Sequence, residues 1–294
     1  MDPCYAECHM CPRGCGARRR EGKTGYCGMP EAVYVSRCAP HLWEEPPISG
    51  TRGSGTVFFT GCNLRCIFCQ NAVISRELKG QPVSEEELWR MICSLLESGV
   101  HNINLVTPTH YTRPLARFLE KYKLRIPVPI LWNSSGYEAV SALRSLEGLV
   151  DIYLPDFKYM SSELSASYSG ASDYAEVATA AILEMHRQVG RPAFDGEEMM
   201  KKGMIIRHLV LPGCRKDGMA VMKHLAGLLP GDAFKISLMR QYTPEFAMHT
   251  PHRNLHRRVT DFEYTSVVEA ALALGLDGYI QGKDSATAAF TPDF

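Results

Sequence analysis

Residues 56–70 read TVFFTGCNLRCIFCQ, a stretch that joins an apolar run to three closely spaced cysteines. The apolar part predicts a buried strand, because it is a short continuous run rich in β-branched and aromatic residues. Cys62, Cys66 and Cys69 follow with the spacing C-x3-C-x2-C. A [4Fe–4S] cluster normally takes four cysteine thiolates, so a triad leaves one iron open to a small molecule. The stretch therefore predicts a strand that leads into an open iron–sulfur site.

Two simpler interpretations of the triad are buried core thiols and a structural zinc site. Buried thiols of an ordinary core have no reason to gather in one loop. Structural zinc is usually held by pairs of ligands a few residues apart, with a second pair elsewhere in the chain. The spacing and the preceding strand favour the iron–sulfur interpretation over both.

Composition predicts which partners and which cellular compartment suit the protein. The 294 residues carry a formal net charge of +0, which predicts no bulk attraction to nucleic acid or to a membrane surface. The N-terminus lacks the basic and apolar regions of a signal peptide, and no run approaches the roughly 18 apolar residues of a membrane span. We therefore interpret the eleven cysteines as metal ligands in a reducing cytoplasm. An exposed cluster further predicts an anaerobic or oxygen-protected setting.

The chain is expected to have two parts. Residues 1–50 hold six of the eleven cysteines, with many glycines and little helical periodicity, whereas residues 51–294 form the second part. Strands and helices alternate in that second part, and such β/α units predict a parallel barrel or open barrel. We expect residues 161–171 and 190–203 to be surface loops. The expected strands are 55–60, 102–106, 128–133, 150–155, 204–211 and 234–239, and the expected helices are 84–98, 111–122, 137–147, 172–189, 217–229 and 262–275.

Polar residues follow each of the expected strands. Chemistry in α/β barrels takes place at the carboxyl ends of the strands, so these residues are candidates for one common site. The candidates after the cysteine loop are Thr107, Thr109 and His110, then Asn133 and Ser134, then Asp156 and Lys158, and finally Arg207 and His208.

Three segments make the chain resemble the radical S-adenosylmethionine (SAM) superfamily. They are the cysteine motif with its aromatic Phe68, the segment 150–158 that ends in Asp-Phe-Lys, and the segment 206–213 that ends in Leu-Pro-Gly. The last two are similar to segments of pyruvate formate-lyase activating enzymes. The chain looks most like an uncharacterised branch named for that likeness, with which it shares Thr-Pro-Thr-His and Leu-Pro-Asp-Phe-Lys-Tyr. The resemblance implies a partial (β/α)6 barrel, a [4Fe–4S] cluster and SAM.

The resemblance also implies roles for single residues. Cys62, Cys66 and Cys69 would ligate the cluster, and Phe68 would pack beside the SAM adenine. Thr107 and Thr109 stand where most relatives carry Gly-Gly-Glu, so the contact to the SAM amino group departs from the family pattern. The other implied roles are Asn133 and Ser134 at the ribose and methionine, Asp156 at a monovalent cation, Arg207 at the SAM carboxylate, and His110, Lys158 and His208 as substrate-facing acid–base groups.

A second group of cysteines precedes the barrel. Cys8, Cys11, Cys15 and Cys27 are separated by glycines that permit tight turns. Four thiolates suit either a structural zinc or a second [4Fe–4S] cluster, and the sequence does not separate the two. Cys4, Cys38 and His41 could each replace one ligand.

The expected activity is reductive cleavage of SAM to a 5′-deoxyadenosyl radical that abstracts a hydrogen atom. It calls for a reductant such as flavodoxin or ferredoxin. The first candidate substrate is a glycine in a partner glycyl-radical enzyme, and the second is a small metabolite or another peptide. The alternative from a different functional class is an interaction protein that binds metal and has no catalytic activity.

Overall fold

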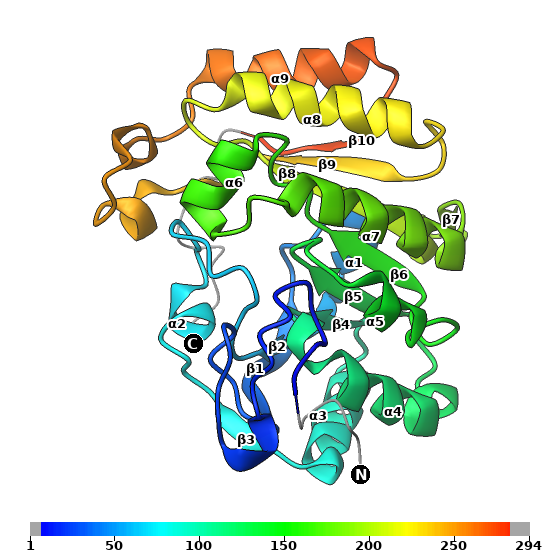
Figure 1. Ribbon diagram of the computed structural model, residues 1–294. Coiled ribbons are helices and arrows are strands. Elements are labelled where there is room, and N and C mark those ends of the chain that lie inside the picture. The colour runs from blue at the N-terminus through cyan, green and yellow to red at the C-terminus, as the bar shows by residue number, and fades with distance from the viewer. Residues whose placement is uncertain (1–6, 283–294) are drawn as a thin grey trace.

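The computed structural model describes residues 7–282, which contain a ten-stranded sheet flanked by helices (Figure 1). Seven strands run parallel to one another, and each pairs with the parallel strand that follows it in the chain. A short hairpin strand that pairs with β8 lies outside this order. The sheet stays open, because strands β10 (Gly278–Ile280) and β3 (Gln81–Val83) lie at its two ends. The expected α/β fold with a partial barrel is thus confirmed. The parallel strands are β2 (Ser54–Phe59), β4 (Ile103–Val106), β5 (Ile130–Ser134), β6 (Ile152–Pro155), β8 (Met200–Leu209), β9 (Lys235–Met239) and β10 (Gly278–Ile280).

The expected helices are all present, although α5 is much shorter than predicted. In Figure 1 helices α8 and α9 lie over the end of the sheet formed by β9 and β10. Their apolar faces pack on the sheet, as their buried residues show. These helices are α3 (Glu85–Glu97), α4 (Thr112–Tyr122), α5 (Val140–Arg144), α7 (Tyr174–Val189), α8 (Arg215–Leu228) and α9 (Asp261–Ala273).

Two segments expected to be loops contain regular structure. Residues 161–171 include helix α6 (Ser162–Ser169), and the Ser161 hydroxyl caps it by accepting a hydrogen bond from the Leu164 N–H. The sequence did not predict this helix, because small polar residues are poor indicators of an amphipathic helix. Residues 190–203 include the short strand β7 (Ala193–Phe194), which pairs with β8. Short 3-10 helices span Arg19–Glu21, Thr109–Tyr111, Lys123–Arg125, Pro244–Ala247 and Arg253–His256, and a single helical turn, α2 (Ala72–Ser75), follows the cysteine loop.

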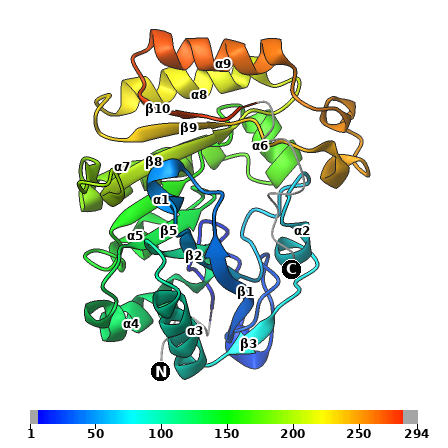
Figure 2. The ribbon, with the colours of Figure 1, turned by 180° about the vertical axis from the view of Figure 1, so that it is seen from behind.

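Residues 33–49, which precede the first parallel strand, contribute a strand and a short helix to the barrel. Strand β1 (Val33–His41) pairs antiparallel with both β2 and β3 (Gln81–Val83). Helix α1 (Pro46–Ser49) then lies against the sheet on the face seen in Figure 2. Its Ile48 is fully buried in a cluster with side chains of β5, β6 and β8, namely Leu131, Ile152, Leu154, Met200 and Ile205. A division of the chain at residue 50 stays a prediction, and it would separate strands that pair with each other.

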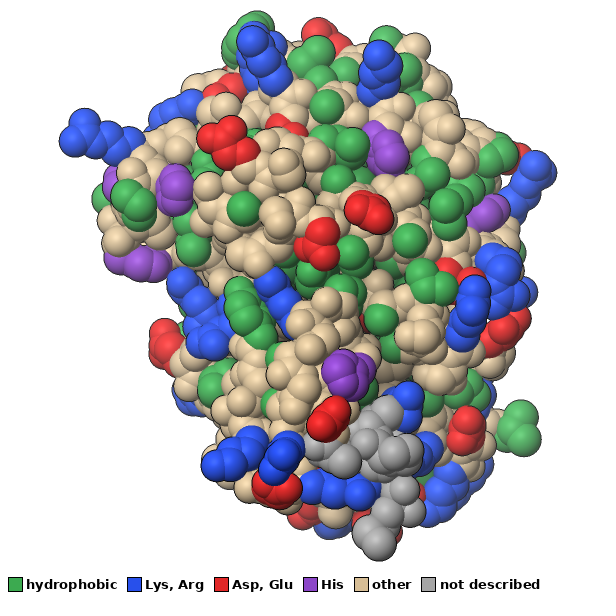
Figure 3. Space-filling view, viewed as in Figure 1, with side chains coloured by type: hydrophobic (Ala, Val, Ile, Leu, Met, Phe, Trp, Pro, Cys, Tyr) green, Lys and Arg blue, Asp and Glu red, His purple; other side chains and the backbone are tan. Residues whose placement is uncertain are grey.

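The surface carries charges of both signs. Figure 3 shows basic and acidic side chains interspersed over one face, in keeping with the net charge of +0. Within residues 7–282, no helix is long and apolar enough to cross a membrane.

Candidate active site

The cysteine loop follows β2 and is built from tight turns. Gly61 has φ of +88°, and a side chain there would place its Cβ 2.3 Å from Met29 Cγ, so only glycine fits. Each of the three sulfurs accepts a hydrogen bond. The donors are the Leu64 N–H to Cys62 (3.3 Å), the Ser169 hydroxyl to Cys66 (3.0 Å) and the Ser75 hydroxyl to Cys69 (3.3 Å). Donors of this kind stabilise thiolates and tune an iron–sulfur cluster.

A cavity of about 340 Å³ opens beside the three cysteines. Its volume lies in the range of small-molecule sites, which is roughly 300–1,000 Å³. Strands β4, β5, β6 and β8 contribute to its wall at or near their carboxyl ends, as expected for an α/β barrel. The lining includes these residues singled out from the sequence: Cys62, Cys66, Phe68, Cys69, Thr107, Asn133, Ser134, Asp156, Lys158 and Arg207.

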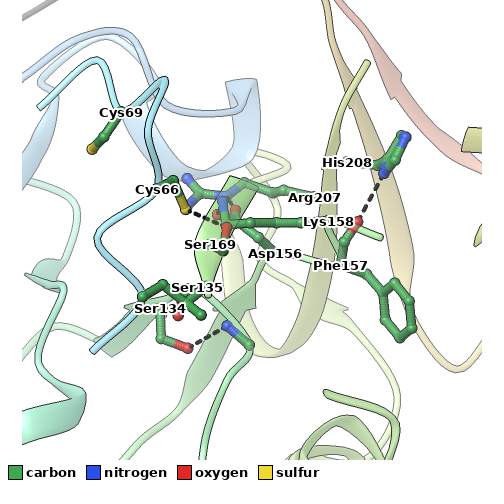
Figure 4. Close-up of polar contacts among 12 residues, drawn as sticks. Cys66, Cys69, Ser134, Ser135, Asp156, Phe157, Lys158, Ser169, Arg207 and His208 are labelled. Carbon is green, nitrogen blue, oxygen red and sulfur yellow. Dashed lines mark hydrogen bonds and ion pairs between the residues drawn. The ribbon is translucent and has the colours of Figure 1, made fainter. Parts of the chain in front are cut away.

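An ion network lies at the base of this cavity. Strands β6 and β8 bring Asp156 and Arg207 side by side, and Arg207 Nε lies 3.1 Å from Asp156 Oδ1. Lys158 Nζ lies 2.5 Å from the other oxygen of the same carboxylate. Figure 4 shows the Lys158 and Arg207 side chains directed toward the cysteine loop. A monovalent cation at Asp156 would therefore have to share this carboxylate with two basic side chains, which would repel it.

The network sets the charge states of its members. Burial raises the pKa of Asp156, but Lys158 and Arg207 outweigh burial and hold this pKa below its usual value. Burial opposes the charge on Lys158, and the Asp156 carboxylate reverses the effect and raises the pKa of this lysine. Lys158 is thus a protonated group suited to pairing with an anion, not a base at neutral pH.

Sequence reasoning missed Glu44, which lies in the segment between β1 and α1. Its Oε2 lies 3.2 Å from Arg207 Nη1, and its Oε1 accepts hydrogen bonds from Asn104 (3.0 Å) and Asn133 (3.2 Å). Asn133 Oδ1 in turn accepts from Arg207 Nη2 at 2.5 Å. The Arg207 guanidinium is therefore engaged by three protein groups, and a SAM carboxylate would compete with them. No local motif around Glu44 signals this contact, because it depends on how α1 enters the barrel.

The two candidate histidines do not line the cavity. His110 is buried, with Nε2 2.7 Å from the Thr60 carbonyl oxygen, and burial lowers its pKa to about 3. His208 follows Arg207 on β8 and so points to the opposite face, as Figure 4 shows. Its Nδ1 lies 2.8 Å from the Phe157 carbonyl oxygen, and burial lowers its pKa to about 4. Both are neutral interior residues, so the expectation that they face a substrate is corrected.

The two threonines after β4 lie in different surroundings. Thr107 lines the cavity in a left-handed conformation with φ of +58°, which is costly for a β-branched residue. Thr109 is buried behind the wall and donates its hydroxyl hydrogen to Glu138 at 2.8 Å. Glu138 also accepts from the Trp132 indole at 2.9 Å, and burial raises its pKa to about 7. Only Thr107 is in a position to contact a ligand.

The arrangement fits a cluster that three protein thiolates hold at one side of a ligand cavity. Three sulfurs with dedicated donors suit the iron, and the cavity beside them, lined by the partly buried Lys158 and Arg207, suits an anionic co-ligand. The fold and this site define an iron–sulfur protein with an open barrel whose cluster faces the ligand.

Comparison with known proteins gives the family. A family model described as the radical SAM superfamily matches residues 56–191, which include the cysteine triad. An uncharacterised protein from Methanocaldococcus jannaschii is 30% identical over 287 residues, covering 93% of this chain and 76% of that protein. The chain belongs to the radical SAM superfamily. Membership implies a [4Fe–4S] cluster and SAM.

Two solved structures are similar to this chain, and the first of them supports the fold. A radical SAM methyltransferase from Sphaerobacter thermophilus has a TM-score of 0.53 and 17% identity, covering 79% of this chain and 69% of that chain. A domain of a pyruvate formate-lyase activating enzyme from Bacteroides vulgatus has a TM-score of 0.43 and 14% identity, covering 58% of this chain and 92% of that domain.

Proposed function

We propose that the protein cleaves SAM reductively and uses the resulting 5′-deoxyadenosyl radical to abstract a hydrogen atom from a substrate. The observation that carries this proposal is the cavity that joins the three donor-supported cysteine sulfurs to a buried ion network. When bound, the cluster supplies the one electron that breaks a carbon–sulfur bond of SAM, with methionine as the other product. A flavodoxin or ferredoxin would replace that electron.

The residues around the cavity have distinct parts in this proposal. Phe68 packs edge-on against Tyr168 and Tyr242, which supports a flat apolar wall for the adenine. Lys158 lines the cavity and interacts electrostatically with Cys66 and Cys69, so we assign it, ahead of Arg207, to the SAM carboxylate. Asn133 and Ser134 would orient the ribose and methionine. Asp156 keeps Lys158 protonated and in place.

For the substrate, we favour a glycine in a partner polypeptide over a small metabolite. Trp43 lines the cavity and is 57% exposed, and the adjacent Leu42 is 54% exposed. Exposed tryptophan beside an active site supports a macromolecular substrate, because aromatic residues are enriched in protein interfaces.

The cleavage proposal is tested by anaerobic reconstitution, reduction with dithionite in the presence of SAM, and quantification of 5′-deoxyadenosine by mass spectrometry. Wild type should form 5′-deoxyadenosine, and the variant Cys62→Ala/Cys66→Ala/Cys69→Ala should form none. Cys93→Ala is the matched control, because Cys93 lies in α3 outside the cavity lining. Loaded wild-type protein that never yields 5′-deoxyadenosine would favour the non-catalytic alternative.

The substrate is tested by deuterium transfer. A peptide that carries α-deuterated glycine should place deuterium in 5′-deoxyadenosine, and a glycyl-radical partner should give a protein radical detectable by electron paramagnetic resonance. Transfer from a small metabolite alone would reject the glycyl proposal and leave the cleavage proposal intact.

A further inference from the structure

The N-terminal segment gathers four cysteines away from the cavity. Backbone hydrogen bonds link Cys8 N to the Ala17 carbonyl and Gly16 N to the Cys8 carbonyl, both at 3.1 Å, which folds the stretch back on itself. The second stretch reaches it at Gly25, where a side chain would place its Cβ 2.4 Å from Cys15 Sγ. Cys11 consequently lies within electrostatic range of the other three: Cys8, Cys15 and Cys27.

These four thiols have no covalent partner. Each is free of disulfide bonds, and Cys8 and Cys27 are buried. Arg19, which is also buried, directs Nη1 toward Cys8 Sγ at 4.0 Å while it donates to the Pro30 and His110 carbonyl oxygens. A buried guanidinium beside a group of thiols is an arrangement that offsets thiolate charge. The segment has few apolar residues of its own to hold it together, so a metal centre would supply the missing stability.

The group has the ligand number of a fully coordinated cluster. A [4Fe–4S] cluster takes four cysteine thiolates, and these four thiols lie within electrostatic range of one another around Cys11. Across residues 7–282, no three Cys, His, Asp or Glu side chains form a group that could hold a metal ion. The same is true of Cys62, Cys66 and Cys69, whose family role is to hold a cluster, so this result does not exclude a cluster at the N-terminal cysteines.

We propose that Cys8, Cys11, Cys15 and Cys27 bind a second, fully ligated [4Fe–4S] cluster that braces the loop of the first. With four protein ligands it has no open iron, so it does not bind SAM. Its role is to order the N-terminal segment against the cysteine triad.

The contacts between this segment and the triad loop support the bracing role. Arg13, between Cys11 and Cys15, donates to the Asn63 carbonyl oxygen (2.7 Å) and to the Ser169 carbonyl oxygen (2.8 Å). Ser169 is the residue whose hydroxyl hydrogen-bonds Cys66. Tyr26, next to Cys27, donates its hydroxyl hydrogen to the Leu64 carbonyl oxygen at 3.2 Å, and Met29 packs on Gly61. The first part of the triad loop, residues 61–64, and the Ser169 donor to Cys66 are therefore in contact with residues near the four cysteines.

The test counts metal in the full chain after anaerobic reconstitution with iron and sulfide. Wild type should hold about eight irons per chain, and Cys62→Ala/Cys66→Ala/Cys69→Ala should keep about four with matching sulfide. Cys11→Ser/Cys15→Ser should lose about four, while Cys93→Ala should match wild type. In the triad variant, one zinc and no iron would overturn the proposal in favour of zinc, and no metal would overturn it altogether.

The triad variant also keeps the test valid if the N-terminal variant fails to fold, because its N-terminal cysteines are intact. The result does not depend on SAM cleavage, so the two proposals can fail separately. The bracing role is tested separately, by the electron paramagnetic resonance spectrum of the reduced triad cluster. Arg13→Ala should keep about eight irons and alter the signal of that cluster. An unchanged signal would reject the bracing role.

Discussion

Arg207 Nε lies 3.1 Å from Asp156 Oδ1, and the two side chains reach each other from paired strands at the base of the cavity. Lys158 holds the second Asp156 oxygen at 2.5 Å. One carboxylate thus fixes both Arg207 and Lys158, the side chain that we assign to the SAM carboxylate. The strength of this arrangement can be measured.

Asp156→Asn should lower the free energy of unfolding by about 3–5 kcal/mol, because it removes the carboxylate partner of Lys158 and leaves Arg207 paired with Glu44, and both cations are largely shielded from water. Urea denaturation under argon would measure the change. Arg191→Ala is the control, since its ion pair with Asp232 has side chains 70% and 60% exposed and should contribute less than about 1 kcal/mol. An Asp156→Asn loss no larger than that of the control would contradict the prediction.

Glu44 and Arg207 should be energetically coupled. A double-mutant cycle with Glu44→Gln and Arg207→Met is expected to show a coupling free energy of about 1–3 kcal/mol, because the ion pair at 3.2 Å is nearly buried. The same cycle with Glu44→Gln and Arg191→Ala should be additive to within about 0.5 kcal/mol. Additivity in the first cycle would mean that Glu44 does not hold Arg207.

Thr107→Gly should raise the stability of the protein and lower its affinity for SAM. Glycine removes the cost of the left-handed conformation at φ of +58°, so the free energy of unfolding should rise by up to about 1 kcal/mol. SAM affinity, measured by equilibrium dialysis, should fall if the hydroxyl of this cavity-lining residue contacts the ligand, because glycine lacks it. Thr107→Ser keeps the hydroxyl and should bind SAM as wild type does. If Thr107→Gly binds SAM equally well, the hydroxyl has no part in binding.

The buried histidines should make the protein sensitive to acid. Unfolded histidine takes up a proton near pH 6.5, whereas burial lowers the pKa of His110 to about 3 and that of His208 to about 4. Stability should therefore fall as the pH drops below 6.5, by at most about 1.4 kcal/mol per pH unit for each histidine.

Urea titrations at about pH 8 and about pH 5.5 would measure this loss, with cluster absorbance followed in parallel. His110→Gln/His208→Gln should show a smaller difference between the two pH values. The exposed His249→Gln serves as control and should behave as wild type does. An undiminished difference in the double variant would assign the acid sensitivity to other groups.

The alternation of apolar runs and amphipathic stretches was enough to predict six of the seven parallel strands and the main helices that cover them, but not the short edge strand β10. Local patterns carry this information because burial on both faces of a strand, or on one face of a helix, imposes its own period on the sequence. The short helix α6 escaped prediction because its small polar residues carry no such period.

The sequence by itself determined the cysteine triad, its strand and the family they indicate, since these depend on residues that are neighbours in the chain. Only the tertiary structure decided which residues face the cavity. It placed Glu44 against Arg207, across 163 positions of sequence, and it turned His208 away while its neighbour Arg207 faces inward. Such contacts depend on strand pairing and on the path of α1 into the barrel, and those are set by packing among segments far apart in the chain.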